Sequence, residues 1–207
     1  MDNSYKKIAD HYDKRFAEHG DTPQGYDWNN YEDMKTRYGV MSDIFVLDRN
    51  EIQAPYSWLD FGCGAGGFYK HLRNVFSPFE IDYSGIDINS NAVDLARITY
   101  PGQGFGVLDI HKDEDWEAFN NPRICKENYD YVVCNGTFTV KKDLTQNQMS
   151  DFMCSSLEKL WSKTNKGIAF NCMSKILDFE RDDLYHVSFD ALSNWVYDNM
   201  SSKFTIR

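Results

Sequence analysis

The sequence predicts a doubly wound α/β fold with a mostly parallel sheet and an N-terminal helical cap. From residue 56 onward, short apolar runs alternate with amphipathic segments of helical period, which is typical of strand–helix units. A glycine-rich turn follows the first of these runs. Acidic residues end each of the first three runs, so a parallel arrangement would place them along one edge of the sheet.

The first fifty residues are polar and aromatic, and their spacing indicates helices. Tyrosine, isoleucine and phenylalanine recur at helical intervals over residues 5–18, and Gly20 provides a stop signal. A second helix is expected over 30–47. We predict that both helices lie over the top of the sheet as a cap, residues 1–50, above a main domain of residues 51–207.

The rest of the chain follows the alternating pattern. Short runs rich in aromatic and β-branched residues predict strands over 57–61, 81–86, 105–108, 129–134 and 167–172. Amphipathic segments with polar start signals predict helices over 66–76, 89–98, 113–119, 145–163 and 188–200. Right-handed crossovers between parallel strands would place these helices on both faces of the sheet.

The C-terminal segment predicts a shortened sheet. Residues 203–207 begin like a strand, but they are too few for the two strands of an antiparallel hairpin. We therefore expect either a truncated product or a shortened sheet with an open edge, and an uncovered edge invites pairing with a second copy of the chain.

Composition limits the classes of function. The 207 residues carry a formal net charge of −10, which disfavours nucleic acid as a partner because phosphates are bound mainly by Lys and Arg. No apolar run is long enough to span a bilayer, and the N-terminus has no apolar signal core. The five cysteines form no C-x-x-C pair, which indicates free thiols in a reducing, cytoplasmic setting and no zinc site. The acidic run at 112–117 also lacks metal-ligand spacing, so no metal is expected.

The glycine-rich turn is the most informative motif. It reads Leu-Asp-Phe-Gly-Cys-Gly-Ala-Gly-Gly over residues 59–67 and joins an expected strand to an expected helix. Glycines at alternate positions let the backbone bend sharply and approach a ligand, while the first amides of the helix face that ligand. The same glycines also satisfy G-x-G-x-x-G, so the turn alone does not separate a dinucleotide site from other nucleoside sites.

The three strand-end acids narrow the choice of ligand. Asp60 suits a cationic ammonium or sulfonium and would repel a pyrophosphate. Asp87 is placed to accept hydrogen bonds from ribose hydroxyls, and Asp109 from an adenine amino group. Together they predict a pocket for a nucleoside with a cationic tail. The alternative is that each acid only caps the helix that follows it.

These residues closely resemble the class I S-adenosylmethionine-dependent methyltransferases. The pattern D-x-G-x-G-x-G, with acids ending the second and third strands, is similar to that family over about residues 56–172, and within it to small stand-alone bacterial and phage-type members. The resemblance implies a Rossmann-like fold, S-adenosyl-L-methionine as cofactor, and a cofactor-binding set made of Asp60, Gly62, Cys63, Gly64, Gly66, Asp87, Ile88, Asp109, Ile110, Asn135 and Gly136. In this set, Asn135 and Gly136 line the place to which the transferable methyl group points.

Methyl transfer from a sulfonium needs mainly alignment and exclusion of water, and a general base only for some acceptors. His186 is the favoured candidate for a base or an acceptor-positioning group, and Tyr185 is a second. His111 and Asn171 are weaker candidates. Arg37 is placed to pair with the cofactor carboxylate. For all of these, an ordinary structural role is the alternative.

Three functions remain open at this point. The first is methyl transfer to an oxygen or nitrogen atom of a small molecule, without nucleic acid or membrane as partner. The second is an NAD-dependent oxidoreductase that uses the same glycine loop. The third is a cofactor-binding module that has no catalytic activity.

Overall fold

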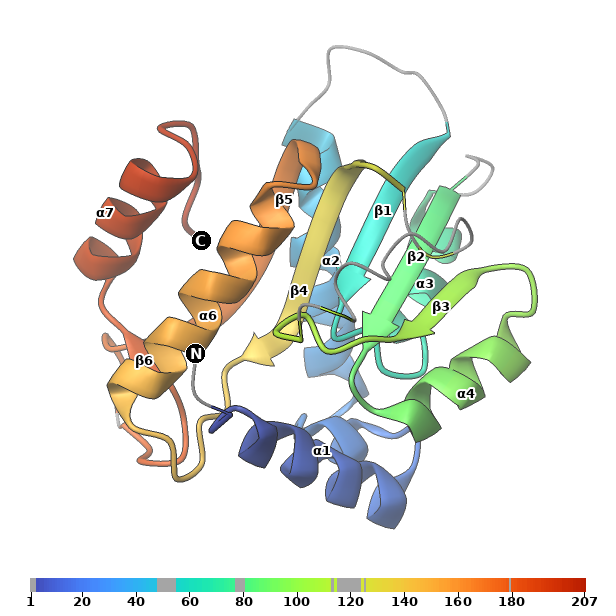
Figure 1. The fold of residues 1–207 in the computed structure, drawn as a ribbon, viewed down its shortest axis with the longest axis horizontal. Coiled ribbons are helices and arrows are strands. Elements are labelled where there is room, and N and C mark those ends of the chain that lie inside the picture. The colour runs from blue at the N-terminus through green and yellow to red at the C-terminus, as the bar shows by residue number, and fades with distance from the viewer. Residues whose placement is uncertain are drawn as a thin grey trace.

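A six-stranded parallel sheet lies between two layers of helices (Figure 1). The computed structural model describes residues 3–47, 55–76, 81–112, 114, 124, 126–178 and 180–207. Apart from residue 114, the expected helix over 113–119 falls outside these residues, as does the expected boundary at residue 50.

The strands run in the order β3-β2-β1-β4-β5-β6, and every neighbouring pair is parallel. Their bounds are β1 Tyr56–Phe61, β2 Ile81–Asp87, β3 Gly104–Val107, β4 Tyr129–Phe138, β5 Thr164–Ser174 and β6 His186–Val187. The strand order changes direction between β1 and β4. After β1 the chain continues to β2 on one side of the sheet, and after β4 it continues to β5 on the other side. This switch point opens a crevice at the carboxyl ends of the strands, where α/β proteins of this kind bind ligands. The predicted fold class is confirmed.

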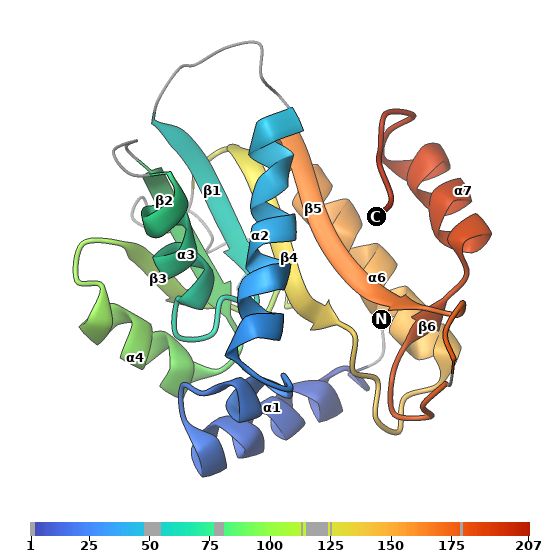
Figure 2. The ribbon, with the colours of Figure 1, turned by 180° about the vertical axis from the view of Figure 1, so that it is seen from behind.

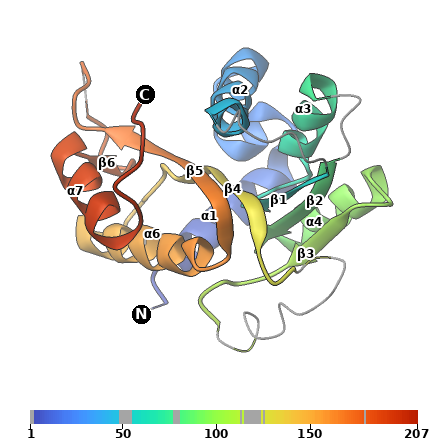
Figure 3. The ribbon, with the colours of Figure 1, turned by 90° about the horizontal axis from the view of Figure 1, so that it is seen from above.

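The helices begin and end close to the predicted positions. Their bounds are α1 Lys6–His19, η1 Pro23–Tyr26, α2 Tyr31–Leu47, α3 Gly67–Val75, α4 Ser90–Thr99, α6 Gln146–Trp161 and α7 Phe189–Asn199. The side chains of Asn89, Thr145 and Ser188 accept hydrogen bonds from the first turns of α4, α6 and α7, and so cap them. Helices α2 and α3 cover one face of the sheet, and α6 and α7 lie on the opposite side (Figures 2 and 3).

The two N-terminal helices have different positions. Helix α1 crosses the carboxyl ends of the strands, with η1 beside it (Figure 1). Helix α2 instead packs on the sheet, where Ile44 lies against Gly167 and Phe45 meets Tyr131 edge-on. This arrangement differs from the expectation that both helices cover the top of the sheet, because α2 buries its apolar side chains on β4 and β5. From here on, the cap means α1 and η1 together.

Aromatic side chains fill the core on both faces of the sheet. Phe68 of α3 and Tyr131 of β4 pack on Trp58 of β1, and Phe152 of α6 packs on Phe138 of β4. Burial of a side chain of this size contributes roughly 1.5–3 kcal/mol. The rigid strands therefore hold their carboxyl ends in fixed positions below the cap.

The sheet is short at its C-terminal edge. Strand β6 pairs with only Met173 and Ser174 of β5. The prediction of a strand over 203–207 is wrong, because this segment forms no strand. Arg207 instead forms an exposed ion pair with Asp43 of α2.

Candidate active site

A cavity lies between the carboxyl ends of β1, β2 and β4 and the overlying cap. The structure brings most of the predicted cofactor-binding residues to its wall. These are Asp60, Gly62, Cys63, Gly64, Asp87, Ile88, Asp109, Ile110, Asn135 and Gly136. Gly66, Arg37, Tyr185 and His186 do not line it.

The glycine loop forms the floor of the cavity and leaves no room for side chains. Gly62 and Gly64 adopt φ values of 81° and 51°, a left-handed conformation that residues with a Cβ adopt rarely. A Cβ on Gly64 would lie 2.8 Å from the Tyr26 ring, and one on Gly62 would lie 2.6 Å from Thr137 Oγ1. The backbone of the loop is therefore exposed to whatever occupies the cavity.

Asp87 connects the second strand to the glycine loop. Its carboxylate accepts hydrogen bonds from the backbone N–H of Gly64 at 2.8 Å and of Asn89 at 2.9 Å. Burial raises the pKa of Asp87, and the two backbone donors act in the opposite direction. Each carboxylate oxygen has further lone pairs, so Asp87 retains the capacity to accept from two adjacent hydroxyl groups.

Asp60 is the most deeply buried of the three acids. It is 2% exposed, and Tyr83 donates a hydrogen bond to it at 2.6 Å. Burial raises the pKa of Asp60 to about 7, with the hydrogen bond from Tyr83 opposing the shift. Near neutral pH the group is thus poised between its two protonation states, and a cation in the cavity would favour the carboxylate.

Asp109 receives a contact that the sequence did not predict. The hydroxyl of Tyr5, just before α1, donates to Asp109 at 2.9 Å, and the backbone N–H of His111 donates at 3.1 Å. The Tyr5 ring stacks on Phe152, with ring centroids 5.5 Å apart. Helical spacing over residues 5–18 did not indicate this contact, which joins Tyr5 to a strand end 104 residues away.

His111 lies in the same wall. Its Nε2 is 2.9 Å from the Ser156 hydroxyl, and its ring packs against Tyr5. Burial, together with the Lys159 ammonium, lowers the pKa of His111 to about 4, so the ring is neutral at physiological pH.

Aromatic residues of the cap region form the roof. The Tyr26 hydroxyl accepts from the backbone N–H of Ala65 at 3.2 Å and donates to Asp21 at 2.9 Å. Trp28 and Tyr38 also line the cavity. Arg37 lies outside it and stacks on the ring of Trp28, with its guanidinium carbon 4.6 Å from the ring centroid.

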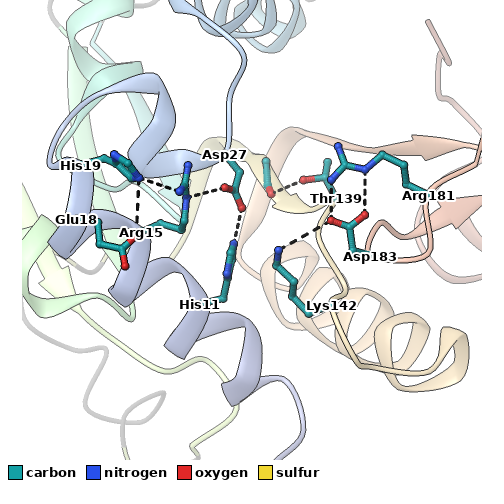
Figure 4. Close-up of polar contacts among 10 residues, drawn as sticks. His11, Arg15, Glu18, His19, Asp27, Thr139, Lys142, Arg181 and Asp183 are labelled. Carbon is teal, nitrogen blue, oxygen red and sulfur yellow. Dashed lines mark hydrogen bonds and ion pairs between the residues drawn. The ribbon is translucent and has the colours of Figure 1, made fainter.

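Exposed ion pairs fasten the cap on its outer side. Asp27 follows η1 in a left-handed conformation with φ 56°, and both His11 and Arg15 of α1 contact its carboxylate (Figure 4). A second group nearby joins Asp183 to Arg181 and Lys142 (Figure 4). Solvent-exposed pairs of this kind contribute about 0–1 kcal/mol each, so buried aromatic contacts do most to hold the cap in place.

An amide network lies at the end of β4. The Asn171 side chain accepts from the backbone N–H of Gly136 at 2.7 Å and donates to the side-chain oxygen of Asn135 at 3.1 Å. The Nδ2 atom of Asn135 is buried and has no hydrogen-bond partner among the described residues.

The structure does not bring the two predicted catalytic residues to the cavity. His186 is 4% exposed; its Nδ1 donates to the carbonyl of Ser174 at 2.9 Å, and its Nε2 accepts from the backbone N–H of Arg181 at 3.2 Å. Both ring nitrogens are thus occupied by backbone, and the ring supports the loop before β6. Tyr185 packs in the core below α6.

Gly66 has a packing role behind the loop. A Cβ there would lie within 3.0 Å of Tyr100 and Phe105, at the junction of α4 and β3.

The described part of the chain lacks two further features. No group of three or more His, Cys, Asp or Glu side chains there is arranged to hold a metal ion. None of its helices is long and apolar enough to cross a membrane.

Residues 59–150 match the model of a family described as a methyltransferase domain. A curated relative is the methyltransferase Rv1506c of Mycobacterium tuberculosis, an activity that its name marks as provisional. It is 29% identical over 140 residues, which cover 67% of this chain and 76% of the relative.

Solved structures share the fold at low identity. Magnesium protoporphyrin IX methyltransferase from Synechocystis PCC 6803, with bound S-adenosylmethionine, has a TM-score of 0.61 at 14% identity, over 96% of this chain and 86% of that one. The plantazolicin methyltransferase BpumL has a TM-score of 0.54 at 18% identity, over 95% and 70% of the two chains. The cyclase SpnF has a TM-score of 0.51 at 14% identity, over 81% and 58%.

The parallel sheet, the glycine loop and the three strand-end acids are arranged as in nucleoside-binding α/β proteins. The family match spans the loop and these acids, so residues 59–150 are similar to the methyltransferase domain family. The resemblance stated above is confirmed, and the dinucleotide alternative is not retained.

Proposed function

We propose that the chain binds S-adenosylmethionine in the cavity under the cap and transfers its methyl group to an oxygen or nitrogen atom of a small molecule. The observation that carries this proposal is the convergence of the glycine loop and all three strand-end carboxylates on one cavity wall. The cavity also fits the cofactor chemically, because the floor is bare backbone and the buried acid Asp60 is placed to meet a cation.

The residues that line the cavity then each bind a different part of the cofactor. The backbone from Gly62 to Gly64 and the Asp60 carboxylate receive the amino-acid end, Asp87 accepts from the ribose hydroxyls, and Asp109 accepts from the adenine amino group. Ile88 and Ile110 offer apolar contact to the adenine ring. The bound cofactor supplies an electrophilic methyl group on a sulfonium.

The residues of the chain contribute alignment and exclusion of water. Tyr26, Trp28 and Tyr38 cover the cavity with aromatic surface, which limits access of solvent to the reacting atoms. A positioned acceptor gains rate from proximity alone, so the absence of His186 and Tyr185 from the wall does not conflict with catalysis.

A small acceptor is favoured by the covered shape of the site. The cap and the aromatic roof cover part of the cavity, which suits a small molecule better than a large polymer. The net charge of −10 disfavours a nucleic-acid acceptor. We place the protein in the cytoplasm, supported by the four free thiols among the described residues.

Calorimetry with S-adenosylhomocysteine and with NAD tests cofactor binding. We expect the homocysteine compound to bind and NAD to give no heat. Tight NAD binding with no response to the homocysteine compound would refute the proposal. The fold also carries a cyclase, so transfer must be tested separately, with tritiated S-adenosylmethionine and a broad set of small acceptors. Binding without transfer to any of them would indicate a cofactor-binding module.

A further inference from the structure

The amide network at the end of β4 has a fixed polarity. A backbone N–H can only donate, so the atom of Asn171 that faces Gly136 at 2.7 Å must be its oxygen. The Nδ2 of Asn171 then points to Asn135, whose own oxygen accepts at 3.1 Å. This sequence of contacts settles the orientation of both side-chain amides, which is otherwise a matter of assignment. It leaves the donor group of Asn135, and not its oxygen, without a partner.

That donor is buried at the wall of the cavity. Asn135 lines the cavity, and its Nδ2 has no hydrogen-bond partner in the part of the chain that is described. A buried polar group without a partner costs about 1–3 kcal/mol. A ligand atom with a free lone pair would recover that free energy.

The position of Asn135 separates it from the predicted nucleoside contacts. Asp87 ends β2 and Asp109 follows β3, both on one side of β1, whereas Asn135 belongs to β4, on the other side. Next to it, Gly136 lacks a Cβ, and the ring of Trp28 comes within 3.1 Å of the place where one would lie. Asn135 therefore lies across β1 from the predicted nucleoside contacts and next to Trp28 of the aromatic roof.

We propose that Asn135 Nδ2 donates a hydrogen bond to the nucleophilic oxygen of the methyl acceptor, and that the acceptor is an oxyanion, a carboxylate or a phenolate. Asn171 is a positioning residue that acts through Asn135. This inference rests on the proposed function. In the step, a lone pair of the oxygen forms the bond to the methyl carbon, and the carbon–sulfur bond breaks with its electron pair going to sulfur. The sulfonium becomes a thioether and the oxyanion a neutral ester or ether, so no proton has to be removed.

The polarity of the donor favours oxygen over nitrogen. An oxyanion has lone pairs for both the methyl carbon and Asn135. A neutral amine has one lone pair, which the methyl carbon needs, and its N–H groups would face another donor. A site that offers Nδ2 therefore discriminates against amines.

The sharpest test is the substitution Asn171→Asp. An aspartate accepts from Gly136 as before, but its second oxygen also accepts, so Asn135 must turn its Nδ2 toward residue 171 and its oxygen toward the cavity. Asn171 does not line the cavity, and the side chain keeps its size. Asn199→Asp on the exposed end of α7 is the matched control, with the same change of charge far from the site.

The readouts are calorimetry with S-adenosylhomocysteine, thermal melting, and tritiated methyl transfer to a panel of benzoates, phenols and matched benzylamines. We expect wild-type protein and the control to methylate one or more oxyanions. Asn171→Asp is expected to lower that kcat/KM by roughly 10- to 150-fold, the range of one hydrogen bond to a charged group, with unchanged affinity for the homocysteine compound. If Asn171→Asp does not fold, Asn135→Ala, which keeps the bond between Gly136 and Asn171, is expected to show the same loss.

Several outcomes would overturn the inference. One is transfer to amines but to no oxyanion, and another is a wild-type protein that binds the homocysteine compound yet methylates no oxyanion. A variant that loses affinity for the homocysteine compound would show that Asn135 contacts the cofactor instead. Wild-type protein that does not bind that compound would reject the proposed function itself, and this inference with it.

Discussion

The Asp87 side chain serves both the proposed ligand and the loop that receives it. Replacement by alanine removes the acceptor for the ribose and also the bonds to Gly64 and Asn89. We expect Asp87→Ala to weaken binding of S-adenosylhomocysteine by about 1–3 kcal/mol, measured by calorimetry. Asp87→Asn keeps one side-chain oxygen and should lose less. Unchanged affinity in Asp87→Ala would show that the ribose assignment is wrong.

The raised pKa of Asp60 predicts that binding of S-adenosylhomocysteine releases a proton to an extent that depends on pH. Its pKa is raised to about 7, so much of the unliganded protein is protonated at about pH 6. The ammonium of S-adenosylhomocysteine stabilises the carboxylate and lowers this pKa, so binding should release a proton at about pH 6 and almost none at about pH 8.5. Calorimetry in buffers of different ionisation enthalpy measures the release. Asp60→Asn should abolish it, and a release that persists in this variant would assign it elsewhere.

The raised pKa of Asp60 also predicts how the stability of the folded protein changes with pH. In the range between its ordinary value of 3.8 and about 7, native Asp60 holds a proton that the unfolded chain has released. The contribution to stability is therefore complete below the ordinary value and is lost as the pH rises through about 7. Urea unfolding at several pH values should show that Asp60→Asn lacks this decline. An identical pH profile in both proteins would contradict the raised pKa.

At the scale of elements, the glycine loop sets the distance between the sheet and the cap. In Gly64→Val, the side chain would collide with Tyr26 and would have to adopt a left-handed backbone conformation. We expect binding of S-adenosylhomocysteine to be lost in calorimetry. Gly102→Val is the control, since a Cβ there meets nothing within 4 Å. Wild-type affinity in Gly64→Val would show that the loop does not face the ligand.

Local signals predicted the elements well where the chain carries its own start and stop groups. Asn89 and Ser188 cap α4 and α7 as expected, and Gly20 ends α1. Helical spacing in α1 and α2 did not reveal their different places, because amphipathic spacing shows that a helix buries a face but not against which surface. The strand expected over 203–207 does not form for a related reason, since a short run of strand-forming residues does not show whether a neighbouring strand is within reach.

At the scale of the whole molecule, the edge beyond β5 remains a candidate interface. Strand β6 covers only two residues of β5, and Phe204 and Ile206 of the neighbouring C-terminal tail are 42% and 41% exposed. We predict a homodimer through this edge. Size-exclusion chromatography with light scattering should give twice the chain mass of 24.1 kDa. A single species at the mass of one chain would contradict it.

The sequence by itself determined the order along the chain of the first five strands, the glycine loop and the acids at three strand ends, whereas it did not reveal strand β6. These features depend on local propensity and on the rule that parallel strands end at one edge, so neighbours along the chain suffice to predict them. Only the tertiary structure decided that Tyr5 reaches Asp109, that His186 is occupied by backbone groups, and that Asn171 orients Asn135. The physical reason is that hydrogen bonds between distant residues depend on how layers pack, and no local pattern in the chain carries that information.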